Sequence, residues 1–201
     1  MKGVVLISGS GSNLQSLIDH AEKIDLDIQA VVSNKEDAYG LKRAQNANIT
    51  THVINHKTFS TREKFDQNLS QIIDQYSPDV IILAGFMRIL TEEFTKKYIG
   101  KMLNIHPSLL PKFQGLNTHQ RALDAKENEH GASVHFVTAE LDGGPVIAQA
   151  RVQVLAHDTA ELLAKRVLAE EHKLLPKVVH CFTQGRLSLN DNCVVLDDKC
   201  L

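Results

Sequence analysis

The chain has 201 residues, of which 43% are hydrophobic and 23% charged, and its formal net charge is −2. This composition excludes a disordered chain and argues against non-specific nucleic-acid binding, which needs a basic excess. No apolar run approaches the roughly 20 residues that span a bilayer, and the first run, 4–7, is too short for a signal peptide. Cys181, Cys193 and Cys200 lack the spacing of a metal or redox motif. We therefore expect three unpaired thiols in a reducing compartment, the cytoplasm, with no membrane partner.

The first hundred residues alternate short β-branched runs with amphipathic segments, a pattern typical of parallel strands joined by helices. We predict strands over 3–8, 28–32, 49–53, 80–84 and 102–105, and helices over 14–21, 39–47, 61–76 and 91–98. The clearest helix is 61–76, where Ser60 and Glu63 have the spacing of a capping box. Ser77 precedes a proline and ends this helix.

The second half of the chain has a different pattern. Two strands, 133–137 and 146–154, are joined by residues 141–145, a connection too short for a parallel crossover, so we expect antiparallel pairing. A long helix from Asp158 follows, with a kink or break expected at Pro176, and a hairpin over 187–196 comes last. The predicted fold class is α/β: a single doubly wound, mostly parallel, Rossmann-like sheet with an antiparallel C-terminal strand portion. We expect it to form one domain over 1–201.

A glycine-rich turn, 9–11, lies between the first strand and the first helix. Backbone N–H groups at such a helix N-terminus bind anions, most often phosphate. A dinucleotide fingerprint would need a third glycine where Leu14 stands, and the end of the second strand, 33–35, has no acidic residue placed for a ribose, which disfavours NAD. The alternative is purely structural: a tight turn followed by a capping box formed by Ser12 and Gln15.

Asn104 and His106 come at the end of the fifth predicted strand and, being two residues apart, point to the same face. Histidine transfers protons near neutral pH, and an amide donates to a developing oxyanion. Asp142, in the glycine-rich connection, is either a turn residue or the partner that orients His106. His119 and His135 are too dispersed for a metal site, so we expect them to be solvated or hydrogen-bonded and predict no metal.

Four segments stand out together: LISGSGSN at 6–13, LAGFMRIL at 83–90, LNIHPSLLP at 103–111 and ELDGGP at 140–145. In this order the chain, from its first strand to about Gly185, resembles the folate-dependent glycinamide ribonucleotide formyltransferase family. The resemblance implies an enzyme of de novo purine biosynthesis that uses 10-formyltetrahydrofolate as co-substrate and glycinamide ribonucleotide as acceptor. Both partners are small molecules, and the chain is expected to act as a monomer or homodimer.

The resemblance also implies roles for individual residues. Asn104, His106 and Asp142 would form the catalytic trio. The phosphate loop would lie within 1–100 and the folate and catalytic segments within 83–150. The nucleotide phosphate would lie on Gly11, Ser12 and Asn13, with Glu171 near the other end of the nucleotide. The folate-binding residues would be Arg62, Met87, Arg88, Ile89, Leu90, Asn104, Thr138, Ala139, Glu140, Leu141 and Asp142.

The sequence departs from the family pattern at several positions. Gln114 replaces an expected proline, Asn117 and Gln120 stand where the family is often more basic, and Leu168 replaces a polar residue expected near the phosphate. Alternative functions are another formyltransferase or a hydrolase that uses 10-formyltetrahydrofolate. Such relatives usually carry an additional domain, for which 201 residues leave no room. A non-catalytic nucleotide-binding module and a Rossmann dehydrogenase are alternatives from other classes.

Overall fold

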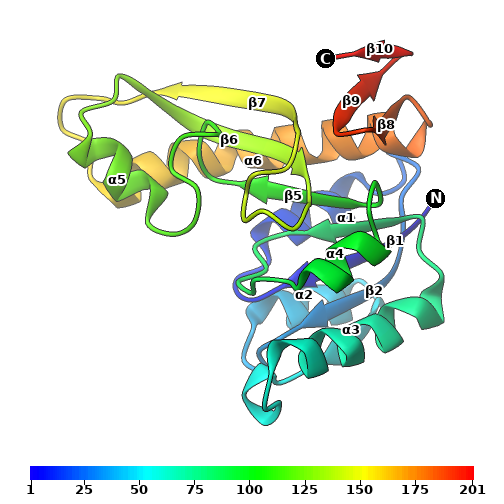
Figure 1. Ribbon diagram of the computed structural model, residues 1–201. Helices are drawn as coiled ribbons and strands as arrows, with labels where there is room; N and C mark the ends of the chain where they lie inside the picture. The colour runs from blue at the N-terminus through cyan, green and yellow to red at the C-terminus, as the bar shows by residue number, and fades with distance from the viewer.

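Seven strands form one sheet through the middle of the molecule, and the computed structural model describes residues 1–201 (Figure 1). The strands are β1 (Lys2–Ile7), β2 (Asp27–Ser33), β3 (Thr50–Val53), β4 (Val80–Leu83), β5 (Met102–His106), β6 (Glu129–Phe136) and β7 (Val146–Gln153). Their order is β3-β2-β1-β4-β5-β6-β7. Strands β1 to β5 pair parallel, whereas β6 pairs antiparallel with both β5 and β7. The predicted fold class is confirmed.

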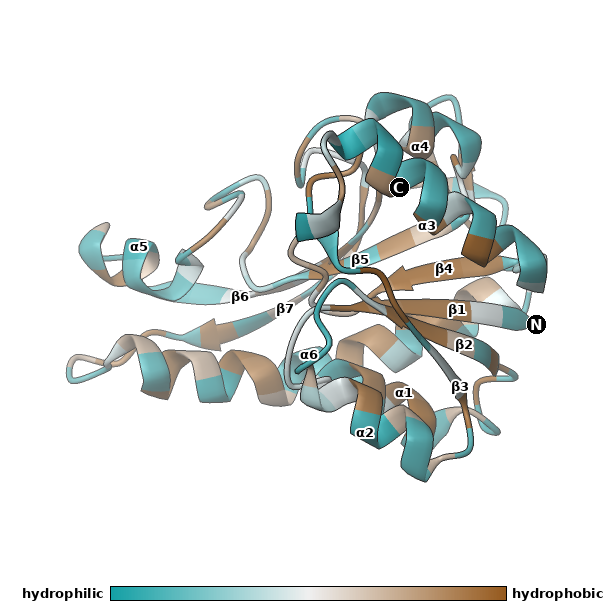
Figure 2. Ribbon diagram, turned by 90° about the horizontal axis from the view of Figure 1, so that it is seen from below, coloured by the Kyte–Doolittle hydropathy of each residue, from teal (hydrophilic) through white to brown (hydrophobic).

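Helices cover both faces of this sheet. One face carries α1 (Ser12–His20), α2 (Tyr39–Asn46) and α6 (Ala160–Thr183), and the other carries α3 (Arg62–Tyr76) and α4 (Glu92–Lys97). Figure 2 shows the hydrophobic strands between these two helical layers, whose outer faces are hydrophilic. No helix combines the length and apolar content needed to cross a bilayer.

Successive side chains along each strand point to opposite faces of the sheet, so the hydrophobic core consists of two clusters, one on each face. Val5 and Ile7 of β1 belong to a cluster of 28 buried residues shared with α1, α2 and α6. Val4 and Leu6 belong to a cluster of 15 shared with α3 and α4. Successive strand residues point to opposite faces, so an uninterrupted apolar strand is buried on both sides.

The structure corrects three details of the predicted elements. Thr61, not Ser60, is the N-cap of α3, and its hydroxyl accepts from the Lys64 N–H, so the predicted capping box is not formed. Helix α6 begins after Thr159 and runs without a break through Pro176. Packing of α6 against α1, β6 and β7 offsets the hydrogen bond that the proline removes. A short helix, α5 (Thr118–Asp124), lies in a segment where none was predicted.

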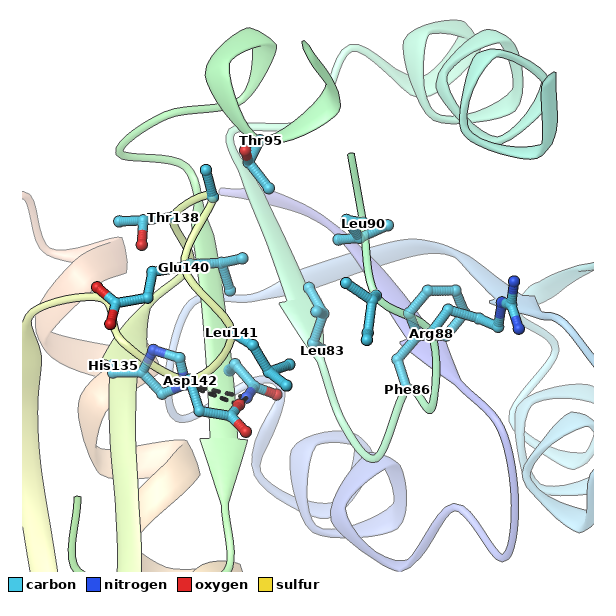
Figure 3. A pocket seen from close by; sticks show the side chains of 14 residues that line it. Leu83, Phe86, Arg88, Leu90, Thr95, His135, Thr138, Glu140, Leu141 and Asp142 are labelled. Atoms are coloured by element: carbon cyan, nitrogen blue, oxygen red, sulfur yellow. Dashed lines mark hydrogen bonds and ion pairs between the residues drawn. The ribbon is translucent and has the colours of Figure 1, made fainter. Parts of the chain in front are cut away.

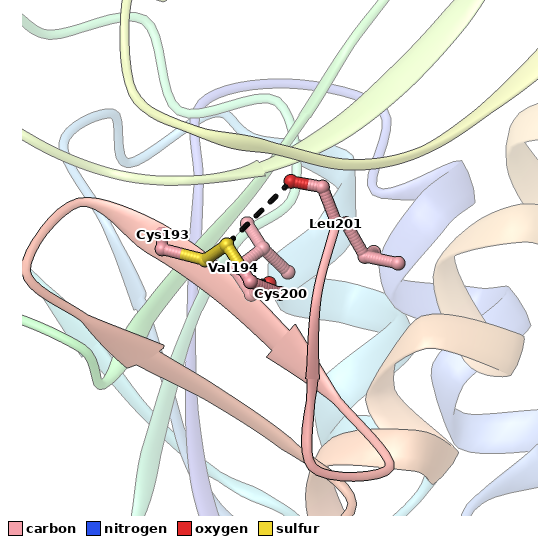
Figure 4. Close-up of a disulfide and its surroundings, with 4 residues drawn as sticks. All are labelled: Cys193, Val194, Cys200 and Leu201. Carbon is pink, nitrogen blue, oxygen red and sulfur yellow. Dashed lines mark hydrogen bonds between the residues drawn. A yellow bond between two sulfur atoms is a disulfide. The ribbon is translucent and has the colours of Figure 1, made fainter.

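The last residues form a separate three-stranded sheet of β8 (Leu187–Asn190), β9 (Cys193–Leu196) and β10 (Lys199–Cys200). Cys193 and Cys200 form a disulfide across it, with their Cα atoms 6.0 Å apart (Figure 4). The prediction of three unpaired cysteines is therefore wrong for this pair, and Cys181 alone is free. The chain reversal after β9 brings β10 alongside it, and this proximity has no signature in the cysteine spacing.

We predict that Leu69→Ala lowers the free energy of unfolding by about 2–5 kcal/mol, because Leu69 is fully buried between α3 and the sheet and its truncation leaves a cavity. Urea unfolding followed by circular dichroism measures this change. Leu155→Ala, at a side chain that is 53% exposed, is the control and should change the free energy by less than about 0.5 kcal/mol. Equal losses in the two variants would contradict the assignment of the core.

Candidate active site

The candidate site lies at the carboxyl edge of the parallel strands, where the chain changes direction across the sheet. From β1 the chain builds β2 and β3 on one side, then returns to place β4 and β5 on the other. In open α/β sheets, ligands bind outside the carboxyl ends of the strands at such a switch point. The glycine-rich turn after β1, the segment after β4 and the end of β5 all meet at this edge.

The structure brings Asn104, His106 and Asp142 together. The Nδ1 atom of His106 lies 3.3 Å from Oδ2 of Asp142, and Asn104 donates from Nδ2 to Oδ1 of Asp142 over 3.4 Å. Asp142 has a φ of 49°, a left-handed conformation that aspartate tolerates better than most residues. The turn and the pairing with His106, which the sequence left as alternatives, are thus both present in the same residue.

His135 is a member of this cluster that sequence reasoning missed. Its side chain is only 2% exposed, and Nε2 lies 3.0 Å from Nδ2 of Asn104 and 3.8 Å from Oδ1 of Asp142 (Figure 3). Nδ1 donates to the Phe136 carbonyl over 2.8 Å, so in the neutral ring Nε2 is left to accept from Asn104. The antiparallel register of β5 and β6 sets Asn104 opposite His135, and no local sequence signal reveals that pairing.

Residues 113–115 cover the cluster from the other side. The Phe113 carbonyl lies 2.9 Å from Nε2 of His106, and the Gly115 N–H donates to Oδ2 of Asp142 over 2.9 Å. Gln114, which stands where a proline was expected, donates from Nε2 to the Asp142 carbonyl over 3.3 Å. This departure from the family pattern therefore adds a contact to the backbone of the candidate catalytic residue Asp142.

Burial and hydrogen bonding set the protonation states of the pair. Burial acts to raise the pKa of Asp142, but the nearby His135 ring, the hydrogen bond from the Gly115 N–H and the adjacent His106 ring outweigh it, so the pKa is lowered. Burial lowers the pKa of His106, although the Phe113 carbonyl and Asp142 act in the opposite direction. Both ring nitrogens of His106 face acceptors, which partly offset the cost of burying the imidazolium.

Two cavities adjoin the trio. Asn104 borders both of them, and each of the other ten predicted folate-binding residues lines at least one. The larger, of about 590 Å³, is lined by Arg62, Met87, Arg88, Ile89, Leu141 and Asp142. The smaller, of about 70 Å³, adds Leu90, Thr138, Ala139 and Glu140 (Figure 3). The side chains of Met87 and Ile89 are more than half exposed. Apolar side chains left open around a few polar groups are typical of a small-molecule site.

The predicted phosphate loop has a conformation that only glycine allows easily. Gly11 is the N-cap of α1 with a φ of 69°, and a Cβ there would lie 2.4 Å from Cα of Gly40. No side chain caps the helix, so the alternative capping box of Ser12 and Gln15 is not formed, and Gln15 instead bonds Asp19 and Arg43. The N–H groups at the start of α1 therefore remain available to an anion.

Glu171, predicted to lie near the other end of the nucleotide, contacts a residue of the predicted phosphate loop. Asn13 donates from Nδ2 to Oε2 of Glu171 over 2.6 Å, and both side chains are buried. Burial raises the pKa of Glu171, against the lowering effect of the Asn13 bond. Helix α6 packs on α1, and this contact brings together two residues 158 positions apart in the chain.

His119 is hydrogen-bonded, which is one of the two states expected for it. It lines the larger cavity, and its Nδ1 lies 3.2 Å from Nε2 of His130, a buried residue of β6. No group of three or more histidine, cysteine or acidic side chains is arranged to hold a metal ion. The two rings form a hydrogen-bonded pair beside the candidate trio.

Comparison with known proteins defines the class. The family model for formyl transferases matches residues 1–179. The chain is 52% identical over 201 residues to the phosphoribosylglycinamide formyltransferase of Escherichia coli K12, covering 99% of this chain and 95% of that protein, and 48% identical to that of Haemophilus influenzae, covering 100% and 95%. The structure of phosphoribosylglycinamide formyltransferase from Coxiella burnetii in complex with CHES superposes with a TM-score of 0.96 at 53% identity, covering 100% of this chain and 95% of that one. The chain therefore belongs to the formyl transferase family and, within it, to the phosphoribosylglycinamide formyltransferases.

We predict that His130 makes folding sensitive to acid. Burial and the neighbouring His119 lower the pKa of His130 from 6.5 to about 4. The unfolded chain thus takes up this proton first as the pH falls, and the free energy of unfolding decreases from about pH 7 toward pH 4. Urea unfolding at several pH values should show a loss about 1–3 kcal/mol smaller in His130→Gln than in the wild type. The exposed His157→Gln variant is the control, and a wild-type slope in His130→Gln would contradict the prediction.

Proposed function

We propose that this protein transfers the formyl group of 10-formyltetrahydrofolate to the primary amine of glycinamide ribonucleotide, a step of de novo purine biosynthesis. The convergence of Asn104, His106 and Asp142 between an apolar-lined cavity and a glycine-rich helix N-terminus carries this proposal. The names of its relatives agree with it. Residues 1–201 would act as one formyltransferase domain, with the phosphate loop within 1–100 and the folate and catalytic segments within 83–150.

The two substrates would enter from opposite sides of the trio. The nucleotide phosphate would bind the N–H groups of Gly11, Ser12 and Asn13 at the start of α1, with Glu171 near the other end of the nucleotide. The folate would occupy the cavities bordered by Arg62, Met87–Leu90 and Thr138–Asp142. This arrangement directs the amine and the formyl carbon toward the end of β5, where the candidate catalytic side chains lie.

The reaction forms a bond from the amine nitrogen to the formyl carbon and breaks the bond from that carbon to N10 of the folate. The amine loses a proton and N10 gains one, through a tetrahedral intermediate whose oxygen is negatively charged. Asn104 would donate to this oxygen in exchange for its 3.4 Å bond to Asp142, which is the longer of its two bonds. The shorter bond to His135 keeps the amide oriented.

His106 would carry the proton between the two nitrogens through Nε2, in exchange for its bond to the Phe113 carbonyl, and Asp142 at Nδ1 would stabilise the charged form of the ring. The ring is largely neutral at the outset because burial lowers its pKa, so it is able to accept a proton. Asp142 remains ionised because its pKa is lowered, and it faces Nδ1 of the ring. The chain's own residues thus supply an oxyanion donor, a proton carrier and a counter-charge.

We propose that the enzyme works in the cytoplasm, because a phosphorylated and charged substrate such as glycinamide ribonucleotide does not cross membranes unaided. Thiols are kept reduced in that compartment. The Cys193–Cys200 disulfide of the structure would therefore be favoured there in its reduced, dithiol form.

The purified protein should remove the formyl group from a 10-formylfolate analogue only when glycinamide ribonucleotide is present. The absorbance of the deformylated product measures turnover, with the nucleotide omitted and then restored. Equal turnover without the nucleotide would identify a hydrolase, and nucleotide binding without turnover would identify a non-catalytic module.

His106→Ala and Asp142→Asn should each lower kcat by roughly 10²–10⁴-fold, the usual contribution of a positioned acid–base group. The KM for the nucleotide should change much less, because the phosphate loop remains intact. Steady-state kinetics measures the effect, and circular dichroism verifies folding. His20→Ala, a surface residue of α1, is the matched control, and wild-type rates in the first two variants would overturn their assignment.

A further inference from the structure

The segment 86–91 is the last part of the connection between β4 and α4 and belongs to no helix or strand, and its residues 86–90 line the cavities of the candidate site. None of the backbone–backbone hydrogen bonds of the molecule involves residues 86–90. Backbone groups in native proteins are normally paired, so an unpaired segment keeps its shape only if side chains hold it. Phe86 and Leu90 provide two apolar anchors, each 8% exposed.

A buried serine holds the start of the segment. The Met87 N–H donates to Oγ of Ser8 over 2.7 Å, and the Ser8 hydroxyl donates to Oδ1 of Asn34 over 2.5 Å. Ser8 and Asn34, which follow β1 and β2, are 4% and 2% exposed. Because its proton is committed to Asn34, the Ser8 oxygen is fixed as an acceptor toward Met87.

A buried carboxylate holds the other end. The Thr91 N–H donates to Oδ2 of Asp66 over 2.6 Å, and Asp66, on the inner face of α3, is 3% exposed. Its other oxygen, Oδ1, is buried without a hydrogen-bond partner. The charges of Arg62 and Arg88, both at the larger cavity, favour the ionised carboxylate although burial raises its pKa. Figure 3 shows the Arg88 side chain directed away from His135 and Asp142.

We propose that Ser8 and Asp66 are positioning residues for the folate: together they clamp the backbone of 86–91 at Met87 and Thr91 and so hold the wall of the folate cavity in its binding shape. The inference rests on the proposed function, because it assigns the folate to this cavity. Neither side chain lines the larger cavity, so each acts through the segment. The two clamps come from opposite ends of the segment and from different layers of the fold.

Kinetics of four variants tests the clamp: Ser8→Ala, Asp66→Ala, Asp66→Asn and the control Asp74→Asn. Ser8→Ala and Asp66→Ala should each raise the KM for the 10-formylfolate analogue about tenfold, the effect of one lost buried hydrogen bond, and leave the KM for the nucleotide within about twofold. Asp66→Asn keeps an oxygen acceptor for Thr91 and should restore most of the affinity. Asp74, an exposed carboxylate on α3 that bonds Lys97 and Tyr98, does not touch the segment, so its variant should behave like the wild type.

Equilibrium binding of the analogue, followed by fluorescence without the nucleotide, measures the same loss of affinity independently of turnover. Equal increases in both KM values, or no change in Ser8→Ala and Asp66→Ala, would overturn the clamp. If Asp66→Ala fails to fold, the test uses Asp66→Asn and Ser8→Ala. The clamp is then overturned if Ser8→Ala binds the folate analogue as tightly as the control Asp74→Asn. A wild-type protein without transferase activity would instead defeat the proposed function, so the two failures are distinguishable.

Discussion

The largely buried carboxylate of Asp142, whose side chain is 10% exposed, is the group on which the rest of the site depends. A charge removed from water is unstable unless hydrogen bonds and opposite charge replace its solvation. Here Asn104, His106, His135 and the Gly115 N–H surround it. These partners come from β5, from β6 and from the loop after Pro111, so satisfying one carboxylate brings three distant parts of the chain together.

The layout of the sheet explains why the partners are available. The switch in strand order between β1 and β4 leaves a crevice at one edge, and the loops that follow the parallel strands all open into it. Adding β6 and β7 in antiparallel orientation extends the sheet beyond β5 and places His135 beside Asn104. The irregular segment 86–91 forms the remaining wall of the crevice. The side chains of Ser8 and Asp66 hold it by hydrogen bonds to its backbone, in place of a ladder of backbone–backbone bonds.

Much of this was predictable because the relevant signals are local. Uninterrupted apolar runs marked the buried strands, the short connection at 141–145 required antiparallel pairing, and Asn104 and His106 share a face by their spacing alone. The failures share one cause, which is contact between residues far apart in the chain. Neither the place of His135, nor the contact of Glu171 with Asn13, nor the pairing of Cys193 with Cys200 has a local signature.

The sequence by itself determined the class of fold, the family and the trio of candidate catalytic residues, because strand and helix periodicity and short motifs are encoded in neighbouring residues. Only the tertiary structure decided how that trio is held. The register of β6 on β5, the packing of α6 on α1 and the docking of α3 beneath the segment 86–91 each depend on burial of apolar faces across the whole chain. The protonation of His106 and Asp142 follows from the same burial, because a pKa is a property of the folded environment.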